Sequence, residues 1–201
     1  MLKLKKIAVT GQMGVGKTTV CQCFENHNSF IVSTDKIVEQ LLISDKECIR
    51  KVKTLLGENV VVDGQIDKKK VARLVFSNKK LLFDLEKILH PLVYSAIHSL
   101  YLKCLELNNN QFFVVEIPLL FEIGWEKFFD VTIYVTCEKT SAFQRARHAG
   151  FSFSDFEARL SRFISQEEAM EKADIVIFNE GTKKQLEEKV EFIINNLRKT
   201  S

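Results

Sequence analysis

The feature that most constrains the fold is a glycine-rich run near the N-terminus. Residues 11–18 fit the pattern G-x-x-x-x-G-K-T, between an apolar stretch at residues 7–9 and a segment with helical character from Thr18 to Asn26. Such a loop needs glycines because its backbone N–H groups wrap around phosphates, at φ/ψ values and distances that a Cβ would obstruct. The pattern therefore predicts a phosphate-binding loop that joins a strand to a helix.

Two side chains of the loop have roles of their own in this prediction. Lys17 reaches the β- and γ-phosphates, and Thr18 offers its hydroxyl to Mg²⁺. The helix that follows points its N-terminal dipole at the same anion. The alternative without a phosphate-binding role is a tight glycine turn that joins a strand to a helix. The residues of the loop that we expect to bind ATP are Gly11, Gln12, Met13, Gly14, Val15, Gly16, Lys17, Thr18 and Thr19.

Five short apolar runs rich in β-formers recur along the chain, and segments of helical length lie between most of them. Unalternating strands separated by helices predict an α/β fold of the P-loop NTPase kind, with a five-stranded parallel sheet flanked by helices. The uneven intervals predict two helical insertions, as in nucleoside monophosphate kinases. The predicted strands are Ile7–Thr10, Phe30–Ser33, Phe112–Ile117, Val131–Thr136 and Asp174–Phe178.

The two insertions divide the chain into five predicted segments. Core segments at 1–34, 111–137 and 174–201 alternate with a helical substrate-binding insertion at 35–110 and a charged lid over ATP at 138–173. The first insertion contains predicted helices at Lys68–Phe76 and Asn78–Leu107, and Pro91 should interrupt or kink the second of these. The last segment ends in a closing helix.

Composition narrows the class of protein. The 201 residues are 46% apolar with a net charge of +3, which fits a globular enzyme and gives no support to a nucleic-acid-binding surface. The five cysteines are scattered without a C-x-x-C pair, which favours reduced thiols in a cytoplasmic protein. Residues Met1–Ile7 carry the positive charge of a secretory signal, but the apolar run with them ends within about five residues. We therefore expect neither a signal peptide nor a membrane partner. The sequence does not indicate the oligomeric state.

A carboxylate follows the second predicted strand. Asp35 should lie at the carboxyl edge of the sheet, on the same side as the phosphate loop. There it can orient a substrate hydroxyl in line with the γ-phosphate or accept its proton. It can equally be the N-cap of a helix at Lys36–Leu42, and the two roles do not exclude one another.

Several motifs together resemble the dephospho-coenzyme A kinase family, from about Lys5 to Gly181. Beside the phosphate loop, they are Ser33-Thr34-Asp35, Asp67-Lys68 leading to Val75-Phe76, Leu89-His90-Pro91-Leu92, Glu116 to Glu122 (E-I-P-L-L-F-E), and Ala173 to Asn179 with Gly181. The phosphate loop is shared by many kinases and GTPases, whereas H-P-L and P-L-L-F-E together are far more specific. The resemblance implies phosphorylation of the ribose 3′-hydroxyl of dephospho-CoA, with ATP and Mg²⁺.

The resemblance also implies roles for single residues. Asp35 corresponds to the carboxylate near the 3′-hydroxyl, and catalysis would rest on Asp35 and Lys17. Glu116 would hold Mg²⁺ through a water, or it simply ends its strand. Asn179 and Gly181 would contact adenine, although turn chemistry also favours both. The implied residues for the acceptor are Asp35, His90, Pro118, Leu119, Leu120 and Glu122, with a purely structural histidine as the alternative for His90.

The sequence departs from the family in the lid. The family has two arginines four residues apart, which fall on Gln144 and His148 here. Arg145 and Arg147 lie one residue away, and a slip of one residue turns a helical side chain by about 100°. They are our predicted lid contacts to ATP on the condition that the helix is re-registered, and Arg159 and Arg162 are further candidates. Ser33 also replaces an acid two residues before Asp35.

Three other readings compete with this one. A nucleoside kinase of the same fold often carries Asp-Arg after the third strand, where this chain has Glu116-Ile117-Pro118. A regulatory GTPase needs N-K-x-D and D-x-x-G, and neither pattern is present. A degenerate ATP-binding module without turnover is favoured only by the substitutions in the lid.

Overall fold

The computed structural model describes residues 4–76, 78–107 and 109–199. The chain divides into two compact units, which we describe separately. The sheet unit contains residues up to Val32 and those from Cys104 onward. The helical unit is Ser33–Lys103.

The sheet has five strands in the order β2-β5-β1-β6-β7. The central strand β1 (Lys5–Thr10) pairs in parallel with β5 (Phe112–Glu116) and β6 (Val131–Thr136), and β6 pairs in parallel with β7 (Ile175–Phe178). The strand β2 (Ser29–Ser33) lies at one edge. All five strands lie where the apolar runs predicted them, so the predicted five-stranded parallel sheet of an α/β fold is confirmed.

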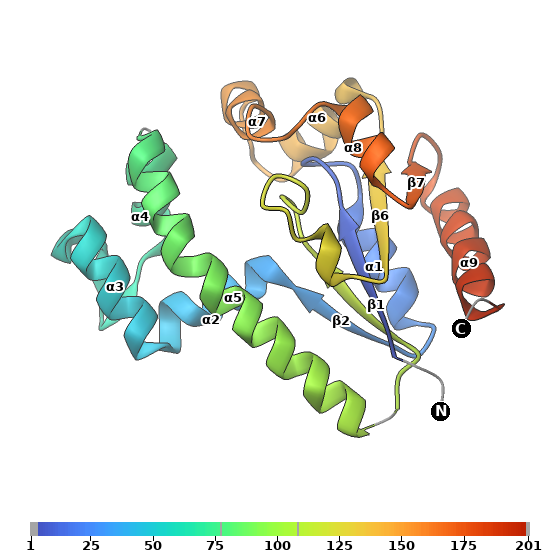
Figure 1. Ribbon diagram of the computed structural model, residues 1–201. Coiled ribbons are helices and arrows are strands. Elements are labelled where there is room, and N and C mark those ends of the chain that lie inside the picture. Colours follow the sequence, from blue (N-terminus) through green and yellow to red (C-terminus); the bar gives the residue numbers. More distant parts are fainter. Residues whose placement is uncertain (1–3, 77, 108, 200–201) are drawn as a thin grey trace. The chain divides into compact units, whose positions relative to one another are not determined.

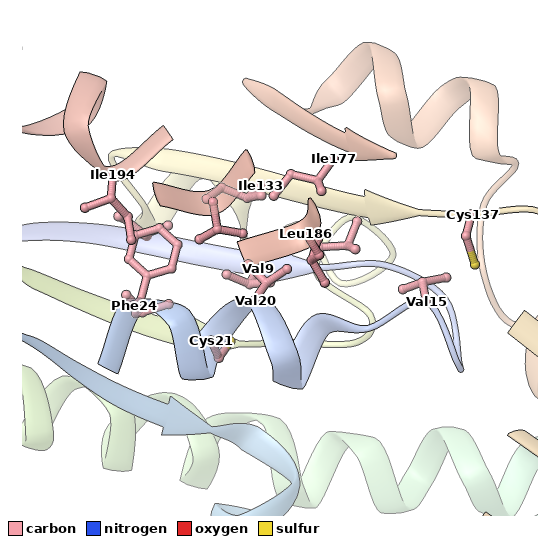
Figure 2. Close-up of a cluster of buried hydrophobic side chains, with 14 of the residues drawn as sticks. Val9, Val15, Val20, Cys21, Phe24, Ile133, Cys137, Ile177, Leu186 and Ile194 are labelled. Carbon is pink, nitrogen blue, oxygen red and sulfur yellow. The ribbon is translucent and has the colours of Figure 1, made fainter. Parts of the chain in front are cut away.

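Helices α1 (Lys17–Glu25) and α9 (Lys183–Lys199) pack on one face of this sheet. Figure 2 shows their side chains meeting those of the strands, with Val20 and Phe24 from α1 and Leu186 and Ile194 from α9. Each such buried side chain contributes about 1.5–3 kcal/mol of transfer free energy. This apolar cluster holds the strand before the phosphate loop and the helix after it.

The segment between β6 and β7 forms three short helices: α6 (Lys139–His148), α7 (Phe153–Leu160) and α8 (Gln166–Lys172). They lie beyond the carboxyl ends of the strands (Figure 1). Ser152 and Asp155 form a capping box that starts α7, and Ser165 caps α8. The rings of Phe143 and Phe156 pack together with centroids 5.3 Å apart, which joins α6 to α7.

The helical unit has its own apolar core, to which α2 (Thr34–Ser44), α3 (Lys46–Leu56) and α4 (Lys68–Phe76) contribute. A turn of 3₁₀ helix, η1 (Glu58–Val60), and a hairpin of β3 (Val61–Val62) and β4 (Gln65–Ile66) lie between α3 and α4. The buried side chains of this core are Leu42, Cys48, Val52, Val60, Ile66, Val71, Val75, Leu85 and Leu89.

The long helix α5 (Lys79–Leu107) contains Pro91, which was predicted to interrupt or kink it. It runs through Pro91 as one continuous helix, so the proline does not interrupt it. Proline removes one intrahelical hydrogen bond, but Leu89 and Leu92 on either side of it both pack in the core of the helical unit. Apolar packing thus outweighs the lost bond. Within the described ranges, no helix is both long and apolar enough to cross a membrane.

Candidate nucleotide-binding site

The phosphate loop, residues 11–18, connects β1 to α1 with the backbone that its glycines permit. Gly14 and Gly16 adopt φ values of +79° and +102°, in the left-handed region. A Cβ on Gly14 would collide with the carbonyl oxygen of Ala142, and one on Gly16 would lie 2.5 Å from Nδ2 of Asn179. The loop therefore needs glycine at both positions, for its conformation and for close packing against its neighbours.

The start of α1 is arranged for an anion. Gly16 is the N-cap, and no side chain caps the helix by a hydrogen bond in the described structure. A phosphate at this end would meet the N–H groups of the first turn together with the positive end of the helix dipole. Lys17 Nζ lies 3.0 Å from the carbonyl oxygen of Gln12, so its positive charge is held over the loop.

A hydroxyl and a carboxylate meet beside the loop. Thr18 Oγ1 lies 3.1 and 3.2 Å from the two carboxylate oxygens of Glu116. Glu116 ends β5 and lies opposite Val9 of β1, the strand that leads into the loop. Oxygen donors of these two kinds suit Mg²⁺, which keeps several waters and takes its other ligands from substrate phosphates. The residues present therefore fit this ion.

One cysteine near this site is structural. Burial and, to a smaller extent, the negative charge of Glu116 raise the pKa of the Cys21 thiol far above its ordinary value. The thiol thus stays protonated at neutral pH, and it packs in the core of the sheet unit.

Arg145 of α6 contacts the phosphate loop. Its guanidinium donates to the carbonyl oxygens of Gly14 at 3.3 Å and Asn179 at 3.2 Å, and to Sγ of Cys137 at 3.5 Å. It is half-buried, whereas Gln144, Arg147 and His148 on the same helix are exposed. The face of α6 that meets the loop therefore carries the predicted residue Arg145, and the positions of the family arginines lie elsewhere on this helix.

Asn179 braces the loop from the end of β7. Its side chain is buried, and Nδ2 donates to the carbonyl oxygen of Val15 at 2.8 Å. Its backbone N–H donates to Thr136 at the end of β6. Gly181, the other predicted adenine contact, is exposed between β7 and α9.

The segment after β5 contacts the strand β1 and the segment between β6 and β7. The hydroxyl of Thr10 donates to the carbonyl oxygen of Pro118 at 3.1 Å, and the carboxylate of Glu122 accepts from the backbone N–H of Ile164, between α7 and α8, at 2.9 Å. Leu120 is buried, whereas Leu119 is half-buried. Glu122, which the family motif predicts to contact the acceptor, thus binds the loop between α7 and α8 in this structure.

Two predicted site residues belong to the helical unit. Asp35 is exposed at the second position of α2, and Ser33 is the N-cap, so the prediction that Asp35 caps this helix is wrong. The helix begins two residues earlier than predicted, which puts the Asp35 carboxylate in its first turn, where the dipole favours a negative charge. His90 is half-buried near the middle of α5.

Sequence reasoning missed that Arg145 and Asn179 both hydrogen-bond to the loop backbone, and that Gln166 Nε2 of α8 lies 3.3 Å from Gln12 Oε1. Nothing in the local pattern signals such bonds, because they join residues more than 130 positions apart. The described residues contain no cluster of three or more His, Cys, Asp or Glu side chains that could hold a metal. The only metal that the site suggests is thus one that the phosphates of a nucleotide would help to bind.

Comparisons with known proteins show the family to which this chain belongs. The model of the dephospho-CoA kinase family matches residues 5–185. The chain is 42% identical to the dephospho-CoA kinase of Chlamydia pneumoniae, over 95% of both chains, and 39% identical to that of Protochlamydia amoebophila, over 98% of both. The solved dephospho-CoA kinase from Campylobacter jejuni superposes with a TM-score of 0.71 at 26% identity, covering 97% of this chain and 98% of the other.

Residues 5–185, which the family model matches, include the phosphate loop, the segment Glu116–Glu122, helices α6 to α8 and Asn179. The relatives match this chain over nearly its full length, and a solved member of the family has the same fold. This chain belongs to the dephospho-CoA kinase family.

Proposed function

We propose that this protein transfers the γ-phosphoryl group of ATP to the ribose 3′-hydroxyl of dephospho-CoA, which gives coenzyme A and ADP. One observation carries the proposal: Lys17, Thr18 and Glu116 lie together at a glycine loop whose backbone is shaped for phosphate, in a chain of the dephospho-CoA kinase family. Kinases of this family use ATP as the phosphoryl donor, which the loop is suited to bind.

The loop residues bind and neutralise the phosphates. The N–H groups at the start of α1 face the α- and β-phosphates, and Lys17 exchanges the Gln12 carbonyl for a phosphate oxygen. Thr18 and Glu116 would hold Mg²⁺, Glu116 by way of a water, and the ion would neutralise negative charge on the phosphates. The ATP contacts of Thr19, Arg147 and Gly181 stay predictions.

Asp35 acts on the acceptor. Its place in the chain, two residues after β2 ends, supports a role at the carboxyl edge where the phosphates bind. The carboxylate orients the 3′-hydroxyl and takes its proton while the bond from that oxygen to the γ-phosphorus forms and the bond to the β,γ-bridging oxygen breaks. In this proposal the acceptor residues are Asp35, His90, Pro118, Leu119, Leu120 and Glu122.

The two helical insertions have separate roles, one in binding the acceptor and the other in covering ATP. Residues 35–110 bind dephospho-CoA, and the lid, residues 138–173, closes over ATP and excludes water, which would otherwise accept the phosphoryl group. The hydrogen bond from Gln166 to Gln12 supports closure of the lid onto the loop, and that from Ile164 to Glu122 supports its closure onto the segment after β5.

The test is Mg²⁺-dependent release of ADP from ATP by the purified protein, with dephospho-CoA, adenosine, AMP or no acceptor. We expect release with dephospho-CoA alone, and a fall of at least about 10²-fold in Lys17→Ala, which loses a donor to the transferring group. Equal release with adenosine or AMP would favour another small-molecule kinase. Binding of ATP without turnover on any acceptor would favour the degenerate module.

A further inference from the structure

Two carbonyl groups of the phosphate loop are held from outside the loop. Arg145 of α6 donates to the carbonyl oxygen of Gly14, and Asn179 after β7 donates to that of Val15. These are consecutive peptide groups in the part of the loop that has the most backbone freedom, because Gly14 and Gly16 flank Val15. The two side chains therefore act on the segment that most needs support.

A peptide group is planar and trans, so its C=O and the N–H of the next residue point in opposite directions. Holding the carbonyl oxygen of Gly14 on one side therefore fixes the direction of the Val15 N–H on the other. Holding the carbonyl oxygen of Val15 fixes the Gly16 N–H in the same way. The donors of a phosphate loop are such N–H groups, so the orientation of two of them depends on Arg145 and Asn179.

The two side chains also support each other. The second nitrogen of the Arg145 guanidinium donates to the backbone carbonyl of Asn179, whose own N–H is bound to Thr136 at the end of β6. Burial raises the pKa of the Cys137 thiol, which therefore stays a neutral acceptor for the same guanidinium. Because its guanidinium donates to Gly14, Asn179 and Cys137 at once, Arg145 is fixed in place and links α6 to the loop and to the end of β7.

We infer that Arg145 and Asn179 are positioning residues that aim the N–H groups of Val15 and Gly16 at the phosphates of ATP. This inference rests on the proposed binding of ATP at the loop, and it deepens that proposal. Arg145 acts through the loop backbone, and its guanidinium contacts neither the γ-phosphate nor adenine.

The test compares the binding of three ligands, each with Mg²⁺: ATP, ADP and inorganic tripolyphosphate. All three place phosphates in the loop, but ADP lacks the γ-phosphate and tripolyphosphate lacks adenine. We expect Arg145→Ala to weaken all three by the same factor, about 10- to 100-fold, which is the usual effect of losing charge-assisted hydrogen bonds. Asn179→Ala should weaken all three in parallel too.

Arg145→Lys sharpens the test. Lysine keeps the charge, but it has one compact donor group where arginine has a fork that can bridge two carbonyls. We expect it to recover only part of the affinity for each ligand. Full recovery would mean that charge alone matters, which would overturn the bridging role.

The matched control is Arg198→Ala at the opposite edge of the same sheet. Arg198 donates to Gln111 Oε1 at 2.9 Å and to the carbonyl oxygen of His27 at 3.4 Å, so it also joins separate elements. Both alanine variants should lower the melting temperature, but only Arg145→Ala should change ligand affinity.

Besides full recovery in Arg145→Lys, three results for Arg145→Ala would contradict the inference. A loss of ATP binding with ADP unchanged would make Arg145 a γ-phosphate ligand. A loss of ATP and ADP binding with tripolyphosphate unchanged would make it an adenine contact. Unchanged affinity for all three would mean that the loop keeps its shape without it. If the wild-type protein binds these ligands but does not phosphorylate dephospho-CoA, the proposed function fails while the affinities still decide the role of Arg145.

Discussion

The phosphate loop and the core of the helical unit are held in different ways. The loop is held by hydrogen bonds to its backbone carbonyls, from Lys17 inside it and from Arg145 and Asn179 outside it. The helical unit is held by buried apolar side chains such as Leu42 and Val52, which need shape more than direction. Substitutions should therefore change mainly function in the loop and mainly stability in this apolar core. Two of the four predictions test these regions, and the other two concern acids of the helical unit that lie outside its core.

The largest effect is expected at an exposed carboxylate of the helical unit. Asp35→Asn keeps the shape but removes the base, and we expect kcat to fall about 10²- to 10⁴-fold, the usual range for a general base. Affinity for ATP should barely change. The measurement is steady-state ADP release with dephospho-CoA, together with the binding constant of ATP.

The control for Asp35 is Glu47→Gln. Glu47 is the exposed acid in the first turn of the next helix, α3, so this change removes a comparable interaction with a helix dipole. It should leave kcat unchanged. If Asp35→Asn keeps activity within a few-fold of the wild type, Asp35 merely stabilises the start of α2, and its predicted catalytic role is wrong.

The second prediction addresses the apolar core. Leu42 is 3% exposed, and Leu42→Ala should lower the free energy of unfolding by about 2–5 kcal/mol through lost burial and a residual cavity. Urea denaturation measures this loss. Ile43→Ala, next to it but 43% exposed, is the matched control and should have a much smaller effect. A loss of ATP affinity in a folded Leu42→Ala variant would break the contrast between the two regions.

The third prediction concerns the charge beside Thr18. Glu116→Gln keeps a hydrogen-bond acceptor but loses the negative charge, so the Mg²⁺ concentration for half-maximal activity should rise about 10-fold or more. Stability should change little, because the Thr18 hydroxyl still has a partner. Titration of activity with Mg²⁺ at saturating ATP measures the shift. An unchanged requirement would show that Glu116 has no part in holding the ion.

The smallest effect is expected at a helix start in the helical unit. Asp67 accepts hydrogen bonds from the backbone N–H groups of Lys70 and Lys69, which hold its pKa below the ordinary value of 3.8. Because the folded-state pKa is lowered, this contribution to stability is present above pH 4 and is lost as the pH falls through the folded value. Asp67→Asn should lower the melting temperature by a few degrees at neutral pH.

The difference in melting temperature between the wild type and Asp67→Asn should shrink as the pH drops below about 4. Thermal unfolding followed by circular dichroism from pH 7 to pH 3 checks this. A difference independent of pH would mean that the charge of Asp67 contributes nothing beyond its capping geometry.

Local patterns predicted most of the sheet unit. The phosphate loop lies within eight consecutive residues, and each strand is a short apolar run, so both could be identified before any contact was known. The contacts of Arg145 and Asn179 with the loop could not, because they depend on how α6 and β7 return to it. The prediction that Arg145 lies at the nucleotide was therefore conditional on a helical register that only the fold decides.

The helical unit was harder to predict in detail. Pro91 was expected to interrupt or kink α5, but packing on both sides keeps the helix continuous. The hairpin of β3 and β4 was missed, although its turn at Asp63-Gly64 carries the Asp-Gly signal and both residues have positive φ. Strands of two residues are too short for an alternating pattern to be visible.

The hydrogen bond from Ile164 to Glu122 has an evolutionary consequence. The loop between α7 and α8 contributes a backbone N–H and the segment after β5 contributes a side chain, so the two ends of the bond depend differently on sequence. Any residue other than proline at position 164 supplies the same donor, whereas position 122 must keep a side chain with an acceptor of the right length. The residue at position 164 can therefore change without loss of this hydrogen bond, whereas the residue at position 122 cannot.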